Sequence, residues 1–126
     1  MVDALNTQGK SIKGAKVLVL GAAYKKDVDD NRESPSVKIM HLLKEKCAEV
    51  YYNDPYIPVL KGMRKYPWLY MESVALNEKL LKTSDCVLVA TDHSDYDYQF
   101  IYEHSQLIVD TRNAMKKFDD SKIFKA

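Results

Sequence analysis

The chain has 126 residues, a length typical of one domain with its own hydrophobic core. Nineteen Lys and Arg residues against eighteen Asp and Glu residues give a formal net charge of +1, and the basic residues form no block, which argues against a nucleic-acid partner. The sequence shows no signal-peptide pattern, transmembrane run or low-complexity segment, so we expect a cytoplasmic protein without membrane contact. Cys47 and Cys86 make no disulfide framework, and we expect both to be buried as small hydrophobic residues.

Apolar runs alternate with helical patterns from the amino end onward. Residues 2–14 are expected to be the tail of a helix followed by a polar connector, as in a domain cut from a longer chain. Residues 16–21 (KVLVLG) are short and rich in branched apolar residues, which favours a buried strand. A helix is expected to begin at Ser34-Pro35-Ser36 and to continue with apolar spacing to Cys47.

The same alternation continues to the end of the chain. Residues 61–73 are expected to be a loop with one short extended piece, because Gly62 and Pro67 interrupt them. The remaining elements are strands over residues 49–53, 85–90, 107–110 and 122–125 and helices over residues 74–83 and 96–103. This order predicts an α/β fold, namely a three-layer Rossmann-like parallel sheet of about five strands with helices on both faces.

Polar residues follow three of the predicted strands. They are Tyr24-Lys25 after the first, Thr91-Asp92-His93 after the third and Asp110-Thr111-Arg112 after the fourth. Because parallel strands end at one edge of a sheet, Lys25 and Arg112 could converge on one anionic ligand, with Tyr24 offering an aromatic face.

Residue type alone leaves other interpretations open. Loop lysines are usually solvated, and Arg32 has Asp29, Asp30 and Glu33 as ready ion-pair partners. His93 is more typical of a strand-end or capping residue than of a metal ligand.

The first strand is not followed by a dinucleotide-binding turn. The sequence there is Gly21-Ala22-Ala23-Tyr24, without the second and third glycines that let a pyrophosphate approach a helix. Asp54 stands where a ribose-binding acid would sit, and without those glycines we interpret it as a turn residue before Pro55. We therefore expect no NAD site of the usual kind in this sheet, and the sequence offers neither a catalytic triad pattern nor paired cysteines for a metal.

Residues 21–36, GAAYKKDVDDNRESPS, closely resemble the start of the carboxyl-terminal, UDP-binding domain of the UDP-glucose/GDP-mannose dehydrogenase family. The segments KVLVLG, NDPYI, SDCVLVATDH and IVDTRN resemble that domain as well, so the resemblance covers essentially the whole chain from Asn6 onward. It implies that residues 15–126 are a UDP-sugar-binding domain. Residues 1–14 would then be the end of the family's central dimerising helix and its connector.

The family oxidises the C6 alcohol of a nucleotide sugar to a carboxylate and reduces two NAD. The resemblance implies that Tyr24, Lys25 and Arg112 contact the UDP-sugar, and that Arg32 reaches NAD held by the neighbouring amino-terminal domain. The family's catalytic cysteine, catalytic lysine and glycine-rich NAD site lie in portions that this sequence does not contain. The chain is therefore expected to be inactive alone, with the amino-terminal and central domains of a full-length homodimeric enzyme as its partners.

Two questions stay open at this level. A receiver-like signalling module without enzymatic activity shares the size and alternation, but it would need paired acids where this chain has Gly-Ala-Ala-Tyr. The segment DVDDNRESP resembles enzymes that act on UDP-N-acetylhexosamines more than enzymes that act on UDP-glucose. GDP-mannose is a further alternative substrate.

Overall fold

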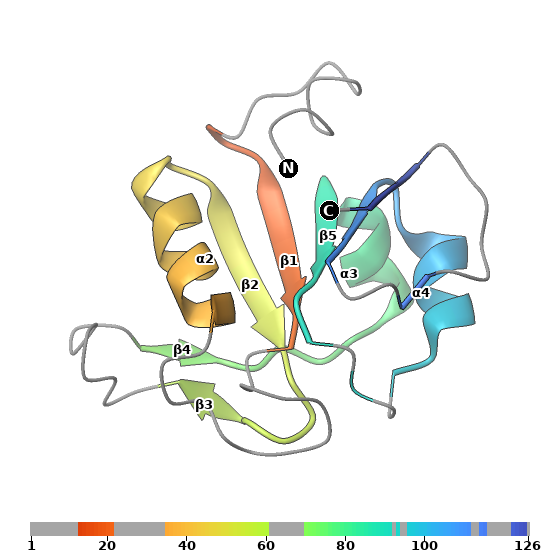
Figure 1. Ribbon diagram of the computed structural model, residues 1–126, viewed down its shortest axis with the longest axis horizontal. Coiled ribbons are helices and arrows are strands. Elements are labelled where there is room, and N and C mark those ends of the chain that lie inside the picture. Colours follow the sequence, from red (N-terminus) through yellow and green to blue (C-terminus); the bar gives the residue numbers. More distant parts are fainter. Residues whose placement is uncertain are drawn as a thin grey trace.

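The computed structural model describes residues 13–21, 35–60, 70–91, 93, 96–111, 114–115 and 122–125. Its centre is a sheet of five parallel strands in the order β2-β1-β5-β6-β7 (Figure 1). The strands are β1 (Lys16–Leu20), β2 (Glu49–Asn53), β5 (Cys86–Val89), β6 (Ile108–Asp110) and β7 (Ile123–Lys125). The predicted α/β class and the parallel sheet are therefore confirmed.

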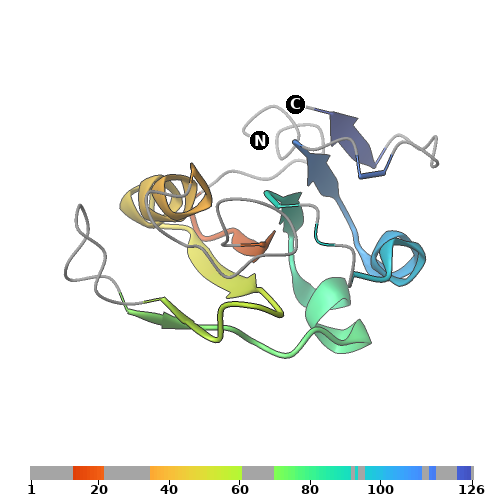
Figure 2. The same ribbon diagram turned by 60° about the horizontal axis from the view of Figure 1, so that its bottom comes forward.

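Helices cover both faces of the sheet. α2 (Pro35–Glu45) lies on one face, whereas α3 (Glu78–Thr83) and α4 (Tyr98–His104) lie on the other (Figure 2). Alternate residues of β1 point to opposite faces, so Val17 and Val19 join the buried cluster that contains Met40 and Leu43 of α2. Leu18 and Leu20 join the second cluster with residues of α3 and α4. The three predicted layers are thus built by side-chain alternation along the strands.

The predicted helix over residues 74–83 is shorter than expected. It begins only at Glu78, because the side chain of Asn77 accepts a hydrogen bond from Leu80 N at 2.8 Å and caps the helix there. The preceding residues are not helical, and Val74 N donates to Tyr52 O at 2.9 Å. The main chain after β4 (Met71–Glu72) is therefore bound to β2 before α3 begins.

The segment between β2 and α3 holds a feature that the sequence did not reveal. β3 (Val59–Leu60) pairs with β4 in a two-stranded antiparallel ribbon, and Leu60 and Met71 join the α2-side cluster. The expected single extended piece is thus half of a pair. Strands of two residues are too short to show alternation, which is why the pairing was missed. Residues 61–69 lie outside the described ranges.

One of the two cysteines was wrongly predicted. Cys86 is fully buried in β5 as expected, but Cys47 is exposed and lies in the turn after α2 rather than in the helix. Ala48 N donates to Leu43 O and Cys47 N to Lys44 O, which closes the helix end and places Cys47 at a φ of 66°. This left-handed conformation at a helix end is usually occupied by glycine.

We expect Cys47→Gly to raise the free energy of unfolding by about 0.5–1 kcal/mol, because glycine adopts positive φ without a steric penalty. Urea unfolding of the variant and the parent chain measures this difference. Cys47→Ala is the matched control, since it removes the thiol and keeps the β-carbon, and it should change stability by less than about 0.5 kcal/mol. A glycine variant no more stable than the alanine variant would contradict this interpretation of the turn.

Candidate functional site

The connections that follow β1 and β5 run toward opposite edges of the sheet. β1 continues through α2 to β2 on one side, whereas β5 continues through α4 to β6 on the other side (Figure 1). In open parallel sheets, ligands bind outside the carboxyl ends of the strands at such a switch point. The topology therefore indicates a site beyond the carboxyl ends of β1 and β5.

β1 and β5 approach each other very closely at this point. Gly21, which directly follows β1, has a φ of 97°, and its N–H donates to Asn53 O at 2.8 Å. A β-carbon built on Gly21 would lie 2.3 Å from Thr91 Cβ and 2.8 Å from Thr91 N. Only glycine leaves enough space for the two strand ends to pack in this way.

The four residues predicted to bind ligands lie outside the described ranges. Tyr24, Lys25 and Arg32 belong to residues 22–34, which follow Gly21, and Arg112 follows Thr111. The strands that precede these segments, β1 and β6, end at the same edge with β5 between them. Two strand spacings amount to about 10 Å, a gap that long cationic side chains can span from both sides. The convergence of Lys25 and Arg112 stays a prediction.

Asp110, at the end of β6, binds the turn at Ala114 and Met115. Its carboxylate is buried and accepts hydrogen bonds from Ala114 N at 3.1 Å and Met115 N at 2.7 Å. The hydroxyl of Thr111 donates to Val89 O at 2.6 Å and so ties the end of β6 to β5. Asp110 was predicted as part of a polar cluster, but no local sequence pattern indicated its bonds to Ala114 and Met115.

Asp54 is the turn residue that the sequence predicted. One carboxylate oxygen accepts hydrogen bonds from Tyr56 N at 2.7 Å and Ile57 N at 3.2 Å, and the other lies 2.9 Å from Nε2 of His93. Both side chains are fully buried. Asp54 is therefore engaged inside the protein and does not fit the role of a ribose-binding acid. With the missing glycines, this means that the described residues do not fit a usual NAD site.

Two tyrosine hydroxyls reinforce the end of β2. Tyr96 donates to Asn53 O at 2.6 Å and Tyr52 donates to Ile57 O at 3.0 Å. Burial, followed by the nearby charge of Asp54, raises the pKa of both tyrosines well above the ordinary value of 10. Both hydroxyls therefore stay protonated donors throughout the neutral range.

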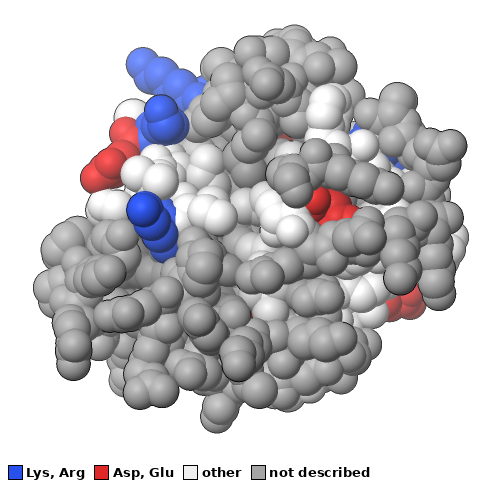
Figure 3. All heavy atoms as spheres, viewed as in Figure 1, with Lys and Arg blue, Asp and Glu red and all other residues white. Residues whose placement is uncertain are grey.

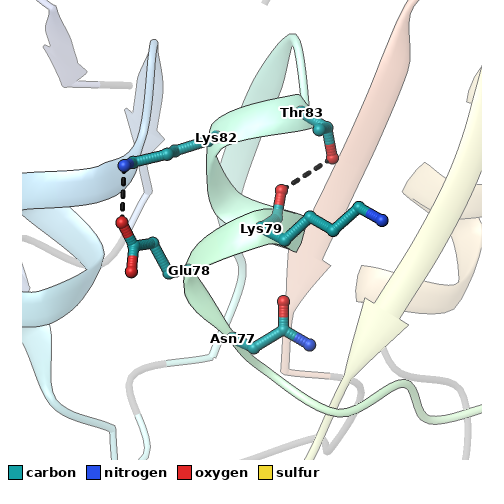
Figure 4. A pocket seen from close by; sticks show the side chains of 5 residues that line it. All are labelled: Asn77, Glu78, Lys79, Lys82 and Thr83. Carbon is teal, nitrogen blue, oxygen red and sulfur yellow. Dashed lines mark hydrogen bonds and ion pairs between the residues drawn. The ribbon is translucent and has the colours of Figure 1, made fainter.

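A surface hollow elsewhere on the described chain is lined by residues of one helix and its cap. It lies beside α3 (Figure 4) and is lined by Asn77, Glu78, Lys79, Lys82 and Thr83. Glu78 pairs with Lys82 at 2.5 Å, and the Thr83 hydroxyl donates to Lys79 O at 2.8 Å. The hydrogen bond from Lys82 lowers the pKa of Glu78. These polar groups bind one another along a single short helix, so we assign the hollow no ligand.

Exposed lysines also lie at the opposite edge of the sheet. Lys44 and Lys46 are exposed at the end of α2, and the view in Figure 3 shows lysine side chains in blue over that end of the molecule with an acidic side chain beside them. This edge bears the amino ends of the parallel strands, so Lys46 is a suitable control for cations at the carboxyl edge. Within the described ranges, no helix is both long and apolar enough to cross a bilayer, and no three His, Cys, Asp or Glu side chains are grouped to hold a metal ion.

We expect Gly21→Ala to be far more destabilising than Gly14→Ala. Both glycines have positive φ, but a β-carbon at Gly14 would meet no atom within 4 Å. Gly14→Ala should thus lower the free energy of unfolding by about 1–2 kcal/mol from backbone strain, and Gly21→Ala by about 1–3 kcal/mol more from overlap with Thr91. Urea unfolding of the two variants gives the comparison, and equal losses would show that the contact at Gly21 is not tight.

The raised pKa values of Tyr52 and Tyr96 predict a stability that declines at alkaline pH. A folded-state pKa above the unfolded value favours the folded protein fully below pH 10, and this contribution is lost as the pH rises beyond 10. Tyr96→Phe should lower stability at pH 7 by about 1 kcal/mol, through loss of the bond to Asn53 O, and should make the alkaline decline shallower. Urea unfolding between pH 7 and 11.5 measures both effects, and parallel profiles for the two proteins would refute the assignment.

Comparison with known proteins identifies the family. The model of the UDP-glucose/GDP-mannose dehydrogenase family, UDP binding domain, matches residues 18–117. The chain is 34% identical over 114 residues to the UDP-N-acetyl-D-mannosamine dehydrogenase of Methanococcus vannielii, which covers 83% of this chain and 24% of that protein. It is 32% identical over 124 residues to the UDP-glucose 6-dehydrogenase of Rickettsia bellii, covering 92% of this chain and 28% of that protein.

Solved structures agree with this result. The UDP-D-ManNAc dehydrogenase of Pyrococcus horikoshii superposes with a TM-score of 0.75 at 26% identity, over 98% of this chain and 28% of that chain. The NDP-N-acetyl-D-galactosaminuronic acid dehydrogenase of Methanosarcina mazei superposes with a TM-score of 0.77 at 28% identity, over 99% and 26%. The chain spans about a quarter of the length of these relatives. It belongs to the UDP-glucose/GDP-mannose dehydrogenase family, as a UDP-binding domain of the carboxyl-terminal type.

Proposed function

We propose that this chain binds the uridine diphosphate part of a nucleotide sugar beyond the carboxyl ends of β1, β5 and β6. The observation that carries the proposal is the switch point between β1 and β5 in a chain of this family. The segments that contain the predicted cations begin on either side of that point, after Gly21 and after Thr111. The receiver-like alternative has no comparable support, because the family match covers residues 18–117.

Three side chains bind the nucleotide sugar in this proposal. Lys25 and Arg112 offset the negative charge of the diphosphate through charge-assisted hydrogen bonds, the guanidinium with two parallel N–H groups. Tyr24 offers an aromatic face to the ligand. Near Arg112 in the sequence, the buried carboxylate of Asp110 binds the main chain of Ala114 and Met115.

The reaction that this binding serves is the oxidation of the C6 alcohol of a UDP-sugar to a carboxylate. The step removes two hydrides, which reduce two NAD, and takes one oxygen atom from water. Neither thiol of this chain fits the family's catalytic cysteine, since Cys86 is buried in β5 and Cys47 lies in a turn at the amino edge. The chain's task is to hold the nucleotide so that the sugar faces catalytic groups on other domains.

NAD is held mainly by an amino-terminal domain in this proposal, and Arg32 reaches it from the segment after β1. The engaged carboxylate of Asp54 supports this division, because the acid that follows β2 is bound inside the protein and does not fit a ribose-binding role. In this proposal residues 1–14 are the end of a central helix and its connector, the full-length enzyme is a homodimer, and it acts in the cytoplasm.

We propose a UDP-N-acetylhexosamine as the sugar nucleotide. The segment DVDDNRESP supports this choice. Named relatives support it as well, among them the UDP-N-acetyl-D-mannosamine dehydrogenase of Methanococcus vannielii at 34% identity. UDP-glucose is the competing substrate, represented by the enzyme of Rickettsia bellii at 32% identity.

Calorimetric titration of the 126-residue chain with UDP tests the binding proposal. We expect Lys25→Ala and Arg112→Ala each to weaken UDP binding about 10- to 100-fold, because each removes one charge-assisted contact. Arg112→Lys should weaken it less than Arg112→Ala, since it keeps the charge and loses the two-pronged geometry. Uridine, which lacks the diphosphate, should bind more weakly than UDP and should not distinguish Lys25→Ala from the parent chain.

Lys46→Ala is the matched control, because it removes an exposed lysine at the opposite edge of the sheet. It should leave the affinity for UDP unchanged. Equal weakening by Lys25→Ala and Lys46→Ala would reduce the effect to a loss of general positive charge and would overturn the assignment of Lys25. A parent chain that shows no heat of binding at millimolar UDP would overturn the binding proposal itself.

A further inference from the structure

A buried hydrogen bond crosses the end of the central strand. His93 follows β5 and Asp54 follows β2, and β1 lies between these two strands. The His93 Nε2 and Asp54 Oδ2 atoms are 2.9 Å apart, and both side chains are fully excluded from solvent. The bond therefore ties the ends of the two strands that flank β1, beside the place where the chain leaves β1 at Gly21.

Several neighbouring side chains contact His93, at its backbone carbonyl and at its ring. The Tyr98 hydroxyl donates to the backbone carbonyl of His93 at 2.9 Å, and the rings of Tyr56 and Tyr96 lie 4.9 Å and 5.9 Å from the imidazole, centroid to centroid. The Tyr96 hydroxyl makes a second link between the same strands through Asn53 O. His93 is thus held in one orientation by neighbours from both sides of β1.

Asp54 extends the connection to the turn after β2. Its second oxygen accepts from Tyr56 N and Ile57 N, and its own N–H donates to the Ser73 hydroxyl at 3.0 Å. Ser73 directly follows β4, so one carboxylate-bearing residue joins the turn after β2, the ribbon and the end of β5. Together with the close contact between Gly21 and Thr91, this makes the carboxyl ends of β2, β1 and β5 one connected unit.

We propose that His93 and Asp54 are positioning residues for nucleotide binding: their hydrogen bond fixes the ends of β2 and β5 on the two sides of β1, at the place where the binding segment after Gly21 leaves the sheet. The inference rests on the proposed function. Both side chains are too deeply buried to touch a ligand, so they act through the strand ends. Replacing a buried polar pair by apolar residues of similar volume is often neutral or stabilising, so stability alone does not account for the pair. A directional bond can instead fix one geometry of the core.

The test uses pairs of variants of the 126-residue chain. His93→Gln keeps an N–H donor at about the reach of Nε2, whereas His93→Leu has similar bulk and no donor. We expect His93→Leu to weaken UDP binding about tenfold, the size of one lost polar contact, and His93→Gln to stay within about threefold of the parent chain. Titrations are made where unfolding curves show every variant to be folded. Without UDP, the amide resonances of Gly21 and Thr91 should move in His93→Leu and much less in His93→Gln.

Leu81→Ala is the control for a general loss of stability, because Leu81 is fully buried on α3 in the second cluster. It should unfold at lower urea concentration and bind UDP with unchanged affinity. Should His93→Leu fail to fold, His93→Asn takes its place, since its amide is too short to reach Asp54, and it should bind UDP more weakly than His93→Gln.

The outcomes separate this inference from the proposed function. Undiminished UDP binding by His93→Leu, or by His93→Asn in its place, overturns the positioning role. If Lys25→Ala still weakens UDP binding in that case, the proposed nucleotide site stands. Equal weakening by the donor-free variant and Leu81→Ala, or no difference between it and His93→Gln, also overturns the role. A parent chain that does not bind UDP overturns both.

Discussion

The close contact between the ends of β1 and β5 is the constraint on which the carboxyl edge depends. Gly21 and Thr91 pack so tightly that a β-carbon would overlap both the side chain and the main chain of Thr91. The contact lies at the switch point of the sheet, because the chain passes from β1 through α2 to β2 on one side and from β5 through α4 to β6 on the other. Only glycine at position 21 permits the two strand ends to pack this closely.

The buried acids at this edge stabilise the fold through bonds to the main chain. The carboxylates of Asp54 and Asp110 are buried, and each accepts hydrogen bonds from two main-chain amides of the turn that follows it. The cationic and aromatic residues of the neighbouring segments are the groups that we propose for an anionic ligand. In that proposal the acids hold the turns and the cations bind the diphosphate.

The sequence predicted the sheet well because buried parallel strands have a strong signature. Residues 16–20 and 86–89 are apolar runs bounded by turn residues, and both are strands. The start of α3 could not be placed in the same way, since Leu76, at helical spacing from Leu80, suggests a longer helix than the Asn77 cap allows. The prediction that Cys47 is buried in a helix was wrong for a related reason. Apolar spacing does not reveal where the helix ends or that Cys47 in the following turn has a positive φ.

The sequence was enough to propose an edge of the sheet for the candidate site, but it did not reveal the hydrogen bonds that connect the strand ends there. Polar residues after three strands were predicted to share one edge of the sheet, because the carboxyl ends of parallel strands meet there. Binding of the nucleotide at this edge stays a prediction. The bond between His93 and Asp54 joins residues 39 positions apart across an intervening strand, and no local pattern indicates such a pair. It depends on the strand order, which becomes known only once β1 is placed between β2 and β5.

Amide chemical-shift mapping with UDP tests the central claim most directly, because it locates the nucleotide on the fold. The account predicts that the resonances of Gly21, Thr91 and Thr111 at the carboxyl edge shift with saturation, while those of Gly14 and Glu49 at the amino edge stay in place. Shifts confined to the amino edge, or to the surface around α3, would contradict it.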